Sequence, residues 1–318
     1  MANYEKIIEL RPEMREFFEN RKKIGFRGDV LTYWANQRAE HYSTDAAGFR
    51  HSTLAGKEYS VADCLRSDRY GIALGASNLF GFGVAGNENC LPSLLAERFG
   101  FPFANATIPG GNSRNLEALL VGLIAGAGHA PQVVVFSNGG DLAGFCESGI
   151  ADPIFGSPNR AQVTGAIASS GPVDNDPDRN FTRLKAFTGL WTSAIATVCR
   201  VYKSPLVLIQ QSTFFEKAKP TPVERECGLG EAFHPSQLHT FANFRKFDEP
   251  FYAERKAIAD RLGVPLAGWG MQDEVTFIDE FHCDADGVRV MSKAVGDEVE
   301  TLLAGKAADR RAEAPAVS

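Results

Sequence analysis

The sequence predicts an α/β fold with three layers, α/β/α, built on a parallel β-sheet of about five strands. Four apolar runs of four to six residues alternate with segments of helical periodicity, and a shorter apolar run follows them. Short apolar runs are typical of strands buried on both faces, and the helices between them cover both faces of a parallel sheet. The chain has 318 residues, 44% of them hydrophobic, which is enough to enclose such a core.

The order of the elements follows from these runs. We expect strands at residues 70–74, 101–106, 132–137, 206–210 and 263–267. We expect helices at residues 5–24, 91–99, 116–127, 184–202, 251–262 and 287–303. The first helix is predicted from apolar residues that recur near helical spacing, namely Ile7, Ile8, Leu10, Met14, Phe17 and Phe18.

The alternation assigns residues 69–304 to the α/β/α domain, and residues 1–68 to an N-terminal helix and arm. Two insertions interrupt the domain, at about 145–180 and 212–250. Both follow strand ends, at the edge where open α/β sheets bind ligands. Residues 305–318 form an Ala/Arg/Glu/Pro-rich tail that we expect to be disordered.

The second insertion carries phenylalanines at near-helical spacing. They are Phe241, Phe244, Phe247 and Phe251. This spacing favours an insertion helix packed on the domain or on a second subunit over an acyl-binding pocket. A homo-oligomer through this Phe-rich insertion is therefore one of the alternatives.

Composition and charge argue against several classes of function. The formal net charge of −6 gives no electrostatic reason to expect nucleic acid or an anionic membrane as a partner. No apolar stretch reaches the roughly 18–20 residues of a membrane helix. The charged start is unlike a signal peptide, so we expect a cytoplasmic protein. The six cysteines lack C-x-x-C spacing and the acidic group around His282 lacks a second set of ligands, so we expect no metal and no cofactor.

A glycine-rich segment, Gly81-Phe-Gly83-Val-Ala-Gly86, matches the G-x-G-x-x-G pattern of dinucleotide-binding loops. Such a loop requires its first glycine directly at the strand end, whereas the expected strand ends at Gly75, six residues earlier. It also requires an acidic residue about 20 positions later, at the end of the second strand. That strand reads FANAT and has no carboxylate, so the pattern does not predict a nucleotide site.

Ser77 follows the first expected strand in a tight turn and is the candidate nucleophile. A catalytic serine needs a histidine as base and an acid that orients the histidine. Of the six histidines, His282 has Asp279 three residues before it, ahead of the last helix. In a loop, this spacing lets the Asp279 carboxylate accept the Nδ1–H of His282, which leaves Nε2 to take the serine proton.

Three consecutive strand ends present residues that can stabilise the oxyanion of a tetrahedral intermediate. The backbone N–H of Ser77 is one donor. The second strand is followed by NATIPGGNSRN, in which Gly110 or Gly111 can bring the backbone close to a substrate. The third strand is followed by NGGD, which offers Asn138 and two glycines, the second of them Gly140.

Over about residues 69–304 the chain resembles the SGNH hydrolases, also called GDSL-type esterases. Gly75-Ala-Ser77 is similar to the Gly-Asp-Ser block of that family, and Asp279 with His282 is similar to its Asp-x-x-His block. The resemblance implies a flavodoxin-like α/β/α fold. It also implies catalysis by Ser77, His282 and Asp279 without a cofactor or a metal.

The middle blocks of the family match less closely. Gly110 is similar to the glycine of the second block, and Asn138-Gly-Gly140-Asp141 falls on the third block, Gly-x-Asn-Asp. Gly140 therefore stands where the family has an oxyanion-hole asparagine, and Ala76 stands where the first block has aspartate. Loss of one such donor typically lowers the rate about 10²- to 10³-fold.

Other side chains near the same rim could take part in binding. Asn138, Asn78 or Asn112 could supply a replacement amide. We also place Gly111 and Arg114 in the candidate substrate-binding region. Arg114 could hold an anionic group, although a solvated surface arginine is the simpler interpretation.

The sequence thus predicts a serine hydrolase that cleaves an ester or acetyl group of a small molecule or a glycan through an acyl-enzyme on Ser77. His282 would be the base and Asp279 the orienting acid. Two alternatives stay open. One is an acyltransferase that uses the same triad with an acceptor other than water, and the other is a non-catalytic binding protein on a decayed site, suggested by Ala76 and Gly140.

Overall fold

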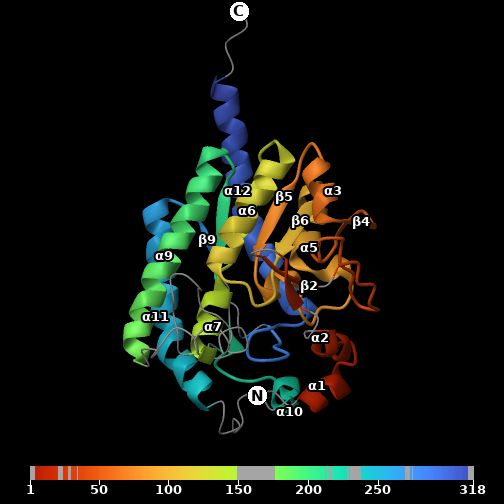
Figure 1. Cartoon of the computed structure of the whole chain (residues 1–318), viewed down its shortest axis with the longest axis vertical. Helices are drawn as coiled ribbons and strands as arrows, with labels where there is room; N and C mark the ends of the chain where they lie inside the picture. Colours follow the sequence, from red (N-terminus) through yellow and green to blue (C-terminus); the bar gives the residue numbers. More distant parts are fainter. Residues whose placement is uncertain are drawn as a thin grey trace, which may run out of the picture.

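A computed structural model describes most of the chain. The described residues are 4–20, 24–27, 30–33, 35–148, 176–211, 213–214, 217–227, 229, 238–268, 273 and 275–313. At the centre lies a five-stranded parallel sheet with helices on both sides (Figure 1). Its strands are β5 (Gly71–Gly75), β6 (Phe103–Thr107), β7 (Val133–Phe136), β8 (Leu206–Ile209) and β9 (Leu266–Ala267). The predicted three-layer α/β/α fold is confirmed.

The strand order β6-β5-β7-β8-β9 places the first strand of the sheet between the second and the third. This is the 2-1-3-4-5 order of flavodoxin-like sheets, in which ligands bind outside the carboxyl ends of the first and third strands. The register aligns Leu74 of β5 with Phe136 of β7, and Gly75 of β5 with Thr107 of β6. The residues that follow these three strands therefore lie along one rim.

The two faces of the sheet are covered by different helices. Side chains at alternate positions of the strands, such as Ala73 and Val135, pack with α5 (Leu91–Phe99) and α12 (Ala285–Glu313). The residues between them, such as Ile72 and Phe136, pack with α3 (Val61–Arg66), α6 (Ser113–Ala127) and α9 (Pro177–Val201). This alternation is what a strand buried on both faces produces.

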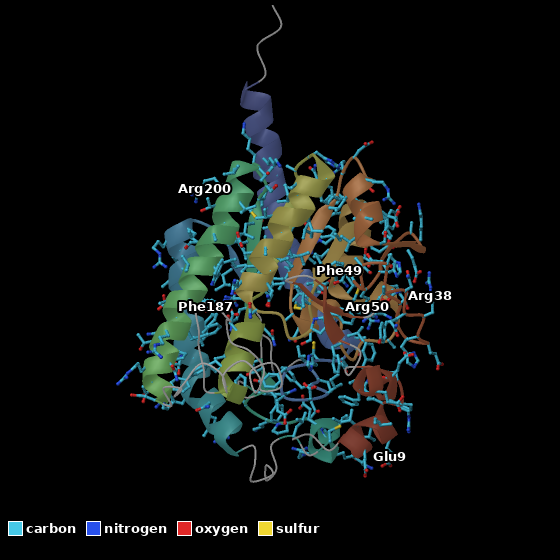
Figure 2. The ribbon with its side chains drawn as sticks, viewed as in Figure 1. Glu9, Arg38, Phe49, Arg50, Phe187 and Arg200 are labelled. Atoms are coloured by element: carbon cyan, nitrogen blue, oxygen red, sulfur yellow. The ribbon has the colours of Figure 1, made fainter. Side chains whose placement is uncertain are left out.

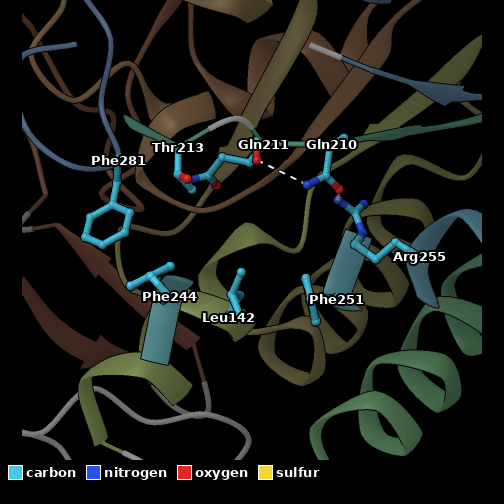
Figure 3. A pocket seen from close by; sticks show the side chains of 9 residues that line it. Leu142, Gln210, Gln211, Thr213, Phe244, Phe251, Arg255 and Phe281 are labelled. Carbon is cyan, nitrogen blue, oxygen red and sulfur yellow. Dashed lines mark hydrogen bonds between the residues drawn. The ribbon is translucent and has the colours of Figure 1, made fainter. Parts of the chain in front are cut away.

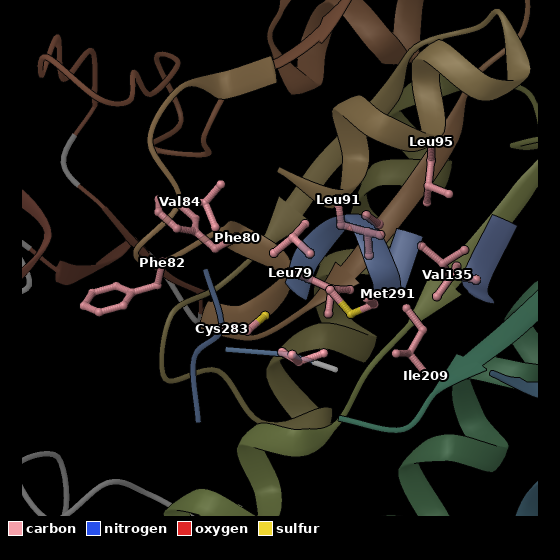
Figure 4. Packing of buried hydrophobic residues seen from close by; sticks show 14 of the residues in the cluster. Leu79, Phe80, Phe82, Val84, Leu91, Leu95, Val135, Ile209, Cys283 and Met291 are labelled. Atoms are coloured by element: carbon pink, nitrogen blue, oxygen red, sulfur yellow. The ribbon is translucent and has the colours of Figure 1, made fainter. Parts of the chain in front are cut away.

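The first of these cores reaches the segment that follows β5. Figure 4 shows Leu79, Phe80 and Phe82 from this segment together with Cys283 and Met291 near the end of the chain. The short helix α4 (Ser77–Phe80) and the start of α12 are thus held in one apolar cluster. This packing brings the two ends of the domain together at the rim.

The N-terminal segment differs from its prediction. The expected helix 5–24 is two helices, α1 (Tyr4–Leu10) and α2 (Met14–Asn20), followed by a strand from Ile24. Pro12 explains the break, because proline lacks the N–H of a helical residue and disfavours helix in the residue before it. Ile7, Met14 and Phe17 are nevertheless buried in the first core.

Further elements of the N-terminal segment were not predicted. They are two antiparallel pairs, β1 (Ile24–Arg27) with β2 (Val30–Tyr33) and β3 (Ser52–Leu54) with β4 (Lys57–Tyr59), and the helix α3. Strands this short give too little periodicity to be recognised from sequence.

The two insertions and the tail are more helical than expected. The first insertion contains the end of α7 (Gly139–Ser148) and the start of α9, and residues 149–175 lie outside the described part of the chain. The second contains α10 (Pro222–Glu226) and most of α11 (Leu238–Leu262), which was expected to begin only at Phe251.

The expected disorder from Gly305 is wrong as far as Glu313, because α12 continues to that residue as a helix that extends from one end of the molecule (Figure 1). Its Ala, Arg, Glu and Lys residues are strong helix formers, so propensity prolongs the helix. Residues 314–318 lie outside the described part.

Three of the four phenylalanines of the second insertion pack within the chain. Phe244, Phe247 and Phe251 are buried in a cluster with residues of α7 and α9. The predicted packing of an insertion helix on the domain is therefore confirmed for these three, and the side chain of Phe241 lies outside the described part. The oligomer suggested from the same residues stays a prediction.

In the described residues, no helix combines the length and the apolar character needed to cross a bilayer. Among the same residues, no group of three or more His, Cys, Asp or Glu side chains is arranged to hold a metal ion.

Candidate active site

Ser77 lies directly after the central strand β5. The strand ends at Gly75, Ala76 is extended, and Ser77 is the first residue of α4. A Cβ at Gly75 would lie 3.0 Å from a Leu79 methyl carbon and 3.3 Å from the Ser137 carbonyl oxygen. A side chain larger than glycine would therefore push this turn away from the end of β7.

His282 approaches Ser77 from the other end of the chain. Its Nε2 lies 2.7 Å from the Ser77 Oγ, although the two residues are 205 positions apart. The loop that carries His282 is closed by a bridge between Phe277 and Cys283 and by a hydrogen bond from the Ile278 N–H to the His282 carbonyl. This closure holds the imidazole at the carboxyl rim of the sheet.

Asp279 fixes the orientation of the imidazole. Its two carboxylate oxygens each lie 2.8 Å from the His282 Nδ1. One of them also accepts the backbone N–H groups of Phe281 at 2.9 Å and His282 at 2.8 Å. Because a carboxylate can only accept, Nδ1 carries the proton and Nε2 is the acceptor that faces Ser77.

Electrostatics keep Asp279 ionised. Burial by itself would raise the pKa of this carboxyl group. The charge of His282, its hydrogen bond and the two backbone N–H groups outweigh that effect, so the pKa of Asp279 lies below its ordinary value. Phe82 packs on the imidazole with 4.6 Å between the ring centroids.

Gly140 lies in the first turn of α7, which follows the third strand, β7, at the rim of the sheet. A Cβ at Gly140 would lie 2.4 Å from the Gly111 carbonyl oxygen and 3.1 Å from the Cβ of Ala76. A contact of 2.4 Å with backbone is impossible without a shift of the chain. An asparagine at position 140 would therefore require the backbone near Gly111 to move.

Asn138, two residues earlier, has an unusual environment. Its side chain is buried, and neither the oxygen nor the nitrogen of its amide has a hydrogen-bond partner. Leaving a buried polar group unpaired costs about 1–3 kcal/mol, so native structures keep few of them. The Ser137 hydroxyl and the Asn78 Oδ1 are also buried without a partner. The segments next to Ser77 thus hold several buried polar atoms without a hydrogen-bond partner.

The other predicted residues take different positions. Gly110 has a positive φ of 74° in the exposed turn after β6, and the next N–H, of Gly111, donates to the Ile108 carbonyl. Asn112 caps α6 by accepting the Asn115 N–H. Arg114 is exposed on α6. The structure therefore brings Gly111 to the rim, whereas the Asn112 side chain already serves the helix.

Asn78 connects the two ends of the site. Its Nδ2 donates to the Phe281 carbonyl at 2.8 Å, which ties the turn of Ser77 to the loop of His282. Cys283 is buried beside this loop, and burial raises the pKa of its thiol. A protonated thiol is a poor nucleophile, and it is the Ser77 hydroxyl that lies next to the imidazole.

Arg50 organises the glycine-rich segment and was not anticipated. Its side chain points into the protein, in contrast to the exposed Arg38 (Figure 2). The guanidinium donates to the carbonyls of Gly81, Val84 and Gly86 at 2.6, 2.8 and 2.8 Å. The three glycines of the G-x-G-x-x-G pattern all have positive φ, which only glycine adopts readily. The segment is therefore wrapped around a buried arginine, and it carries Phe82 to the imidazole.

Asp141 joins two of the helices that border the rim. It is fully buried in α7 and accepts the N–H of Ser113, at the start of α6, at 3.0 Å, together with the Ser113 hydroxyl. Burial raises the pKa of Asp141 to about 6, while the Ser113 bonds and the charge of Arg255 act in the opposite direction. Its place in the third sequence block was the signal that could have identified it.

Comparisons with known proteins give matches among solved structures. No protein-family model matches the chain, and no curated protein matches it. The solved structures that are similar include a GDSL-like lipase from Bacteroides thetaiotaomicron, with 13% identity and a TM-score of 0.43 over 74% of this chain and 89% of that one.

An extracellular lipase from Streptomyces rimosus has 13% identity and a TM-score of 0.45 over 71% of this chain and 99% of that one. A carbohydrate acetylesterase family member from Sinorhizobium meliloti has 13% identity and a TM-score of 0.42 over 74% and 99%. Similarity at this level carries no conclusion about activity, which has to come from the geometry of the site.

Proposed function

We propose that the chain is a serine hydrolase of SGNH type that cleaves an ester or acetyl group through an acyl-enzyme on Ser77. The observation that carries the proposal is the line of three side chains. The Ser77 Oγ lies 2.7 Å from the His282 Nε2, and Asp279 lies 2.8 Å from the Nδ1 on the far side of the ring. A nucleophile, a base and an orienting acid within hydrogen-bond reach are the requirements for covalent acyl transfer.

The reaction follows from the proton positions. His282 Nε2 takes the hydroxyl proton as Ser77 attacks the ester carbonyl, and the imidazolium is stabilised by Asp279. Collapse of the tetrahedral intermediate breaks the bond to the alcohol, which leaves with the proton from His282. Water, deprotonated by the same imidazole, then breaks the bond to Ser77. The products are the free acid and the alcohol, and the serine regains its proton.

The oxyanion of the intermediate needs donors other than a side chain at position 140. We assign this role to the N–H of Ser77 and the unpaired amide of Asn138, with the backbone of Gly110 and Gly140 at the same rim. The Asn138 nitrogen has no hydrogen-bond partner, which supports the assignment because its N–H groups are not used elsewhere. Preorganised donors in a buried site are worth several kcal/mol in the transition state.

Turnover of a panel of short- and long-chain p-nitrophenyl esters tests the proposal. The wild type should release p-nitrophenol, and Ser77→Ala should lose about 10⁴- to 10⁶-fold of that rate. A Ser77→Ala protein with wild-type turnover would contradict the assignment. Adding an alcohol or an amine to the assay distinguishes hydrolysis from acyl transfer, because a transferase would divert the acyl group to the added acceptor.

A further inference from the structure

The second insertion contacts the segment 275–283, called the histidine loop below, which carries the acid and the base of the proposed triad. Near the start of the insertion, the Phe214 N–H donates to the Glu280 carbonyl at 3.1 Å. On α11, Phe244 packs against Phe281 with 4.8 Å between the ring centroids, and both side chains line the small cavity of Figure 3. The insertion thus contacts the two residues that lie between the acid and the base.

A buried ion pair in the insertion binds the same loop. The Lys217 Nζ lies 2.9 Å from the Glu224 Oε1, and the two side chains are 1% and 0% exposed. The same carboxylate oxygen accepts the Phe277 N–H at 2.8 Å, and the Lys217 Nζ also donates to the Val275 carbonyl. The pair therefore binds one donor and one acceptor of the loop backbone.

These two contacts lie next to the point at which the histidine loop closes. Phe277 forms the bridge that closes the loop, and the next residue, Ile278, donates its N–H to the His282 carbonyl at 2.8 Å. Asp279 follows directly in the sequence. Glu224 thus holds the backbone two residues before the acid of the proposed triad.

Stability alone gives little reason for an ion pair at this position. Transferring two charges out of water costs about as much as their attraction returns, so apolar residues of similar volume often replace such a pair without loss. An apolar pair could neither accept the Phe277 N–H nor donate to the Val275 carbonyl. What the charged side chains add is therefore directional, because they fix where the loop backbone lies.

Glu224 is itself held in place by its own helix. Its second carboxylate oxygen, Oε2, accepts the Thr221 N–H, and the Thr221 hydroxyl accepts the Glu224 N–H at 3.2 Å. Together these bonds form the capping box of α10. The two oxygens of Glu224 thus have separate partners, with Oε1 directed to the histidine loop and Oε2 to the start of α10.

We propose that Lys217 and Glu224 are positioning residues, which hold the histidine loop so that Asp279 and His282 keep the geometry needed to activate Ser77. The proposal rests on the proposed hydrolase function. Both side chains act on the triad through the backbone of the loop. A displacement of about 1 Å can lower a rate about 10²-fold, so a loosened loop should lower kcat and leave KM nearly unchanged.

The kinetic test uses the separate partners of the two Glu224 oxygens. In Glu224→Gln the remaining oxygen can still accept from Phe277 and Lys217, whereas the new amide nitrogen faces the Thr221 N–H. This variant should lose thermal stability and keep kcat within about threefold of the wild type. Glu224→Ala removes the loop contact and should lower kcat about 10- to 100-fold, at a temperature where circular dichroism shows the protein folded.

Two further variants control this comparison. Thr221→Ala removes the hydroxyl that caps the same helix and keeps Glu224, so it should lower Tm and leave kcat unchanged. Lys217→Met keeps the length of the side chain and removes the donor to the Val275 carbonyl. It should lower kcat as Glu224→Ala does, and it replaces that variant in the test if Glu224→Ala does not fold. A wild-type kcat in either folded variant, or an equal loss in Glu224→Gln or Thr221→Ala, would overturn the proposal.

A measurement without turnover separates this proposal from the hydrolase function. In protein labelled with ¹⁵N-histidine, ¹H NMR detects the Nδ1–H proton of His282, which is bonded to Asp279. Its resonance should shift or broaden in Glu224→Ala and in Lys217→Met, and should keep the wild-type position in Thr221→Ala. An unchanged resonance in the first two variants would refute the positioning role even if esters are cleaved, and a selective change would support it even if they are not.

Discussion

The described part of the chain contains two serine–histidine pairs with an acid beside them, and they are built differently. In the first, Ser77 faces the His282 Nε2 at 2.7 Å, and Asp279 holds the opposite nitrogen of the ring. In the second, Ser43 lies 2.9 Å from the His51 Nδ1, but the carboxylate of Glu58 lies 3.1 Å from the serine itself. The acid therefore contacts the histidine in one pair and the serine in the other.

This difference decides which hydroxyl can be activated. An ionised carboxylate only accepts, so the proton of Ser43 points to Glu58 and the His51 Nδ1 must donate to the serine. The imidazole cannot then take the proton. Asn87 also donates to Ser43 and to Glu58, each at 2.7 Å, which completes a closed structural network. A serine next to a histidine is thus a nucleophile only where the acid lies behind the ring.

The largest expected effect comes from exchanging the two acids for amides. Asp279→Asn should lower kcat/KM about 10⁴-fold, because the amide favours the wrong tautomer of His282. Glu58→Gln should leave kcat/KM within about threefold, since its network does not touch the substrate. Steady-state kinetics on both variants provide the measurement. A similar loss in the two proteins would remove the distinction between the pairs.

Two buried asparagines give the next contrast. Asn138→Ala should lower kcat about 10²- to 10³-fold through loss of an oxyanion donor. Its stability should hardly change, because the amide has no partner in the protein. Asn87→Ala should instead lower the free energy of unfolding by about 1–3 kcal/mol, since it removes one donor to Glu58 and one acceptor of Arg50.

Urea unfolding measures the free energy of unfolding of the two asparagine variants, and initial rates on the same preparations measure their kcat. The account of Asn138 would fail if its alanine variant unfolded more easily and kept the wild-type kcat.

A smaller effect is expected at Phe82, whose ring packs on the imidazole of His282. Phe82→Leu should lower kcat/KM about three- to tenfold, because an aromatic pair contributes about 0.5–1.5 kcal/mol beyond its buried area. The matched control is Phe101→Leu, which removes a stacked ring on Phe103, away from His282. Kinetics of the two variants over pH 5–9 would show whether only Phe82 changes the titration of the active enzyme. Identical profiles for both would mean that Phe82 is only packing.

The smallest difference concerns acid stability, where the two pairs should behave alike. Burial alone would raise the pKa of both Asp279 and Glu58. Hydrogen bonds and nearby charges outweigh burial, so both pKa values lie below the ordinary value. A carboxyl group whose pKa is lowered in the folded state stabilises the protein at pH values above its unfolded pKa of about 4. This stabilisation is lost as the pH falls through the folded-state pKa. Asp279→Asn and Glu58→Gln should each flatten the fall in Tm on acidification, as thermal scans from pH 3 to pH 7 would show. An unchanged acid slope in either variant would contradict its depressed pKa.

Much of the fold could be read from the sequence because it rests on local patterns. Buried strands such as β5 and β7 appear as short apolar runs, and the Asp279–His282 spacing lies within one loop. The position of the candidate nucleophile, Ser77, followed from the strand that ends before it. These features need no knowledge of distant contacts.

The rest depends on contacts between residues far apart in the chain. A side chain at Gly140 would collide with the carbonyl of Gly111, and Arg50 donates to carbonyls more than 30 positions away. The backbone groups that Lys217 and Glu224 bind are likewise visible only in three dimensions. No periodicity or motif reports such neighbours, so the sequence showed the glycines and the charged residues without their roles.

Labelling with a fluorophosphonate probe, followed by peptide mapping, tests the central claim most directly. The account predicts one adduct per chain, on Ser77, with none on Ser43 and none after denaturation or in the Ser77→Ala variant. A probe bound to Ser43, or a folded wild-type protein that takes up no probe, would contradict the assignment of Ser77 as the nucleophile.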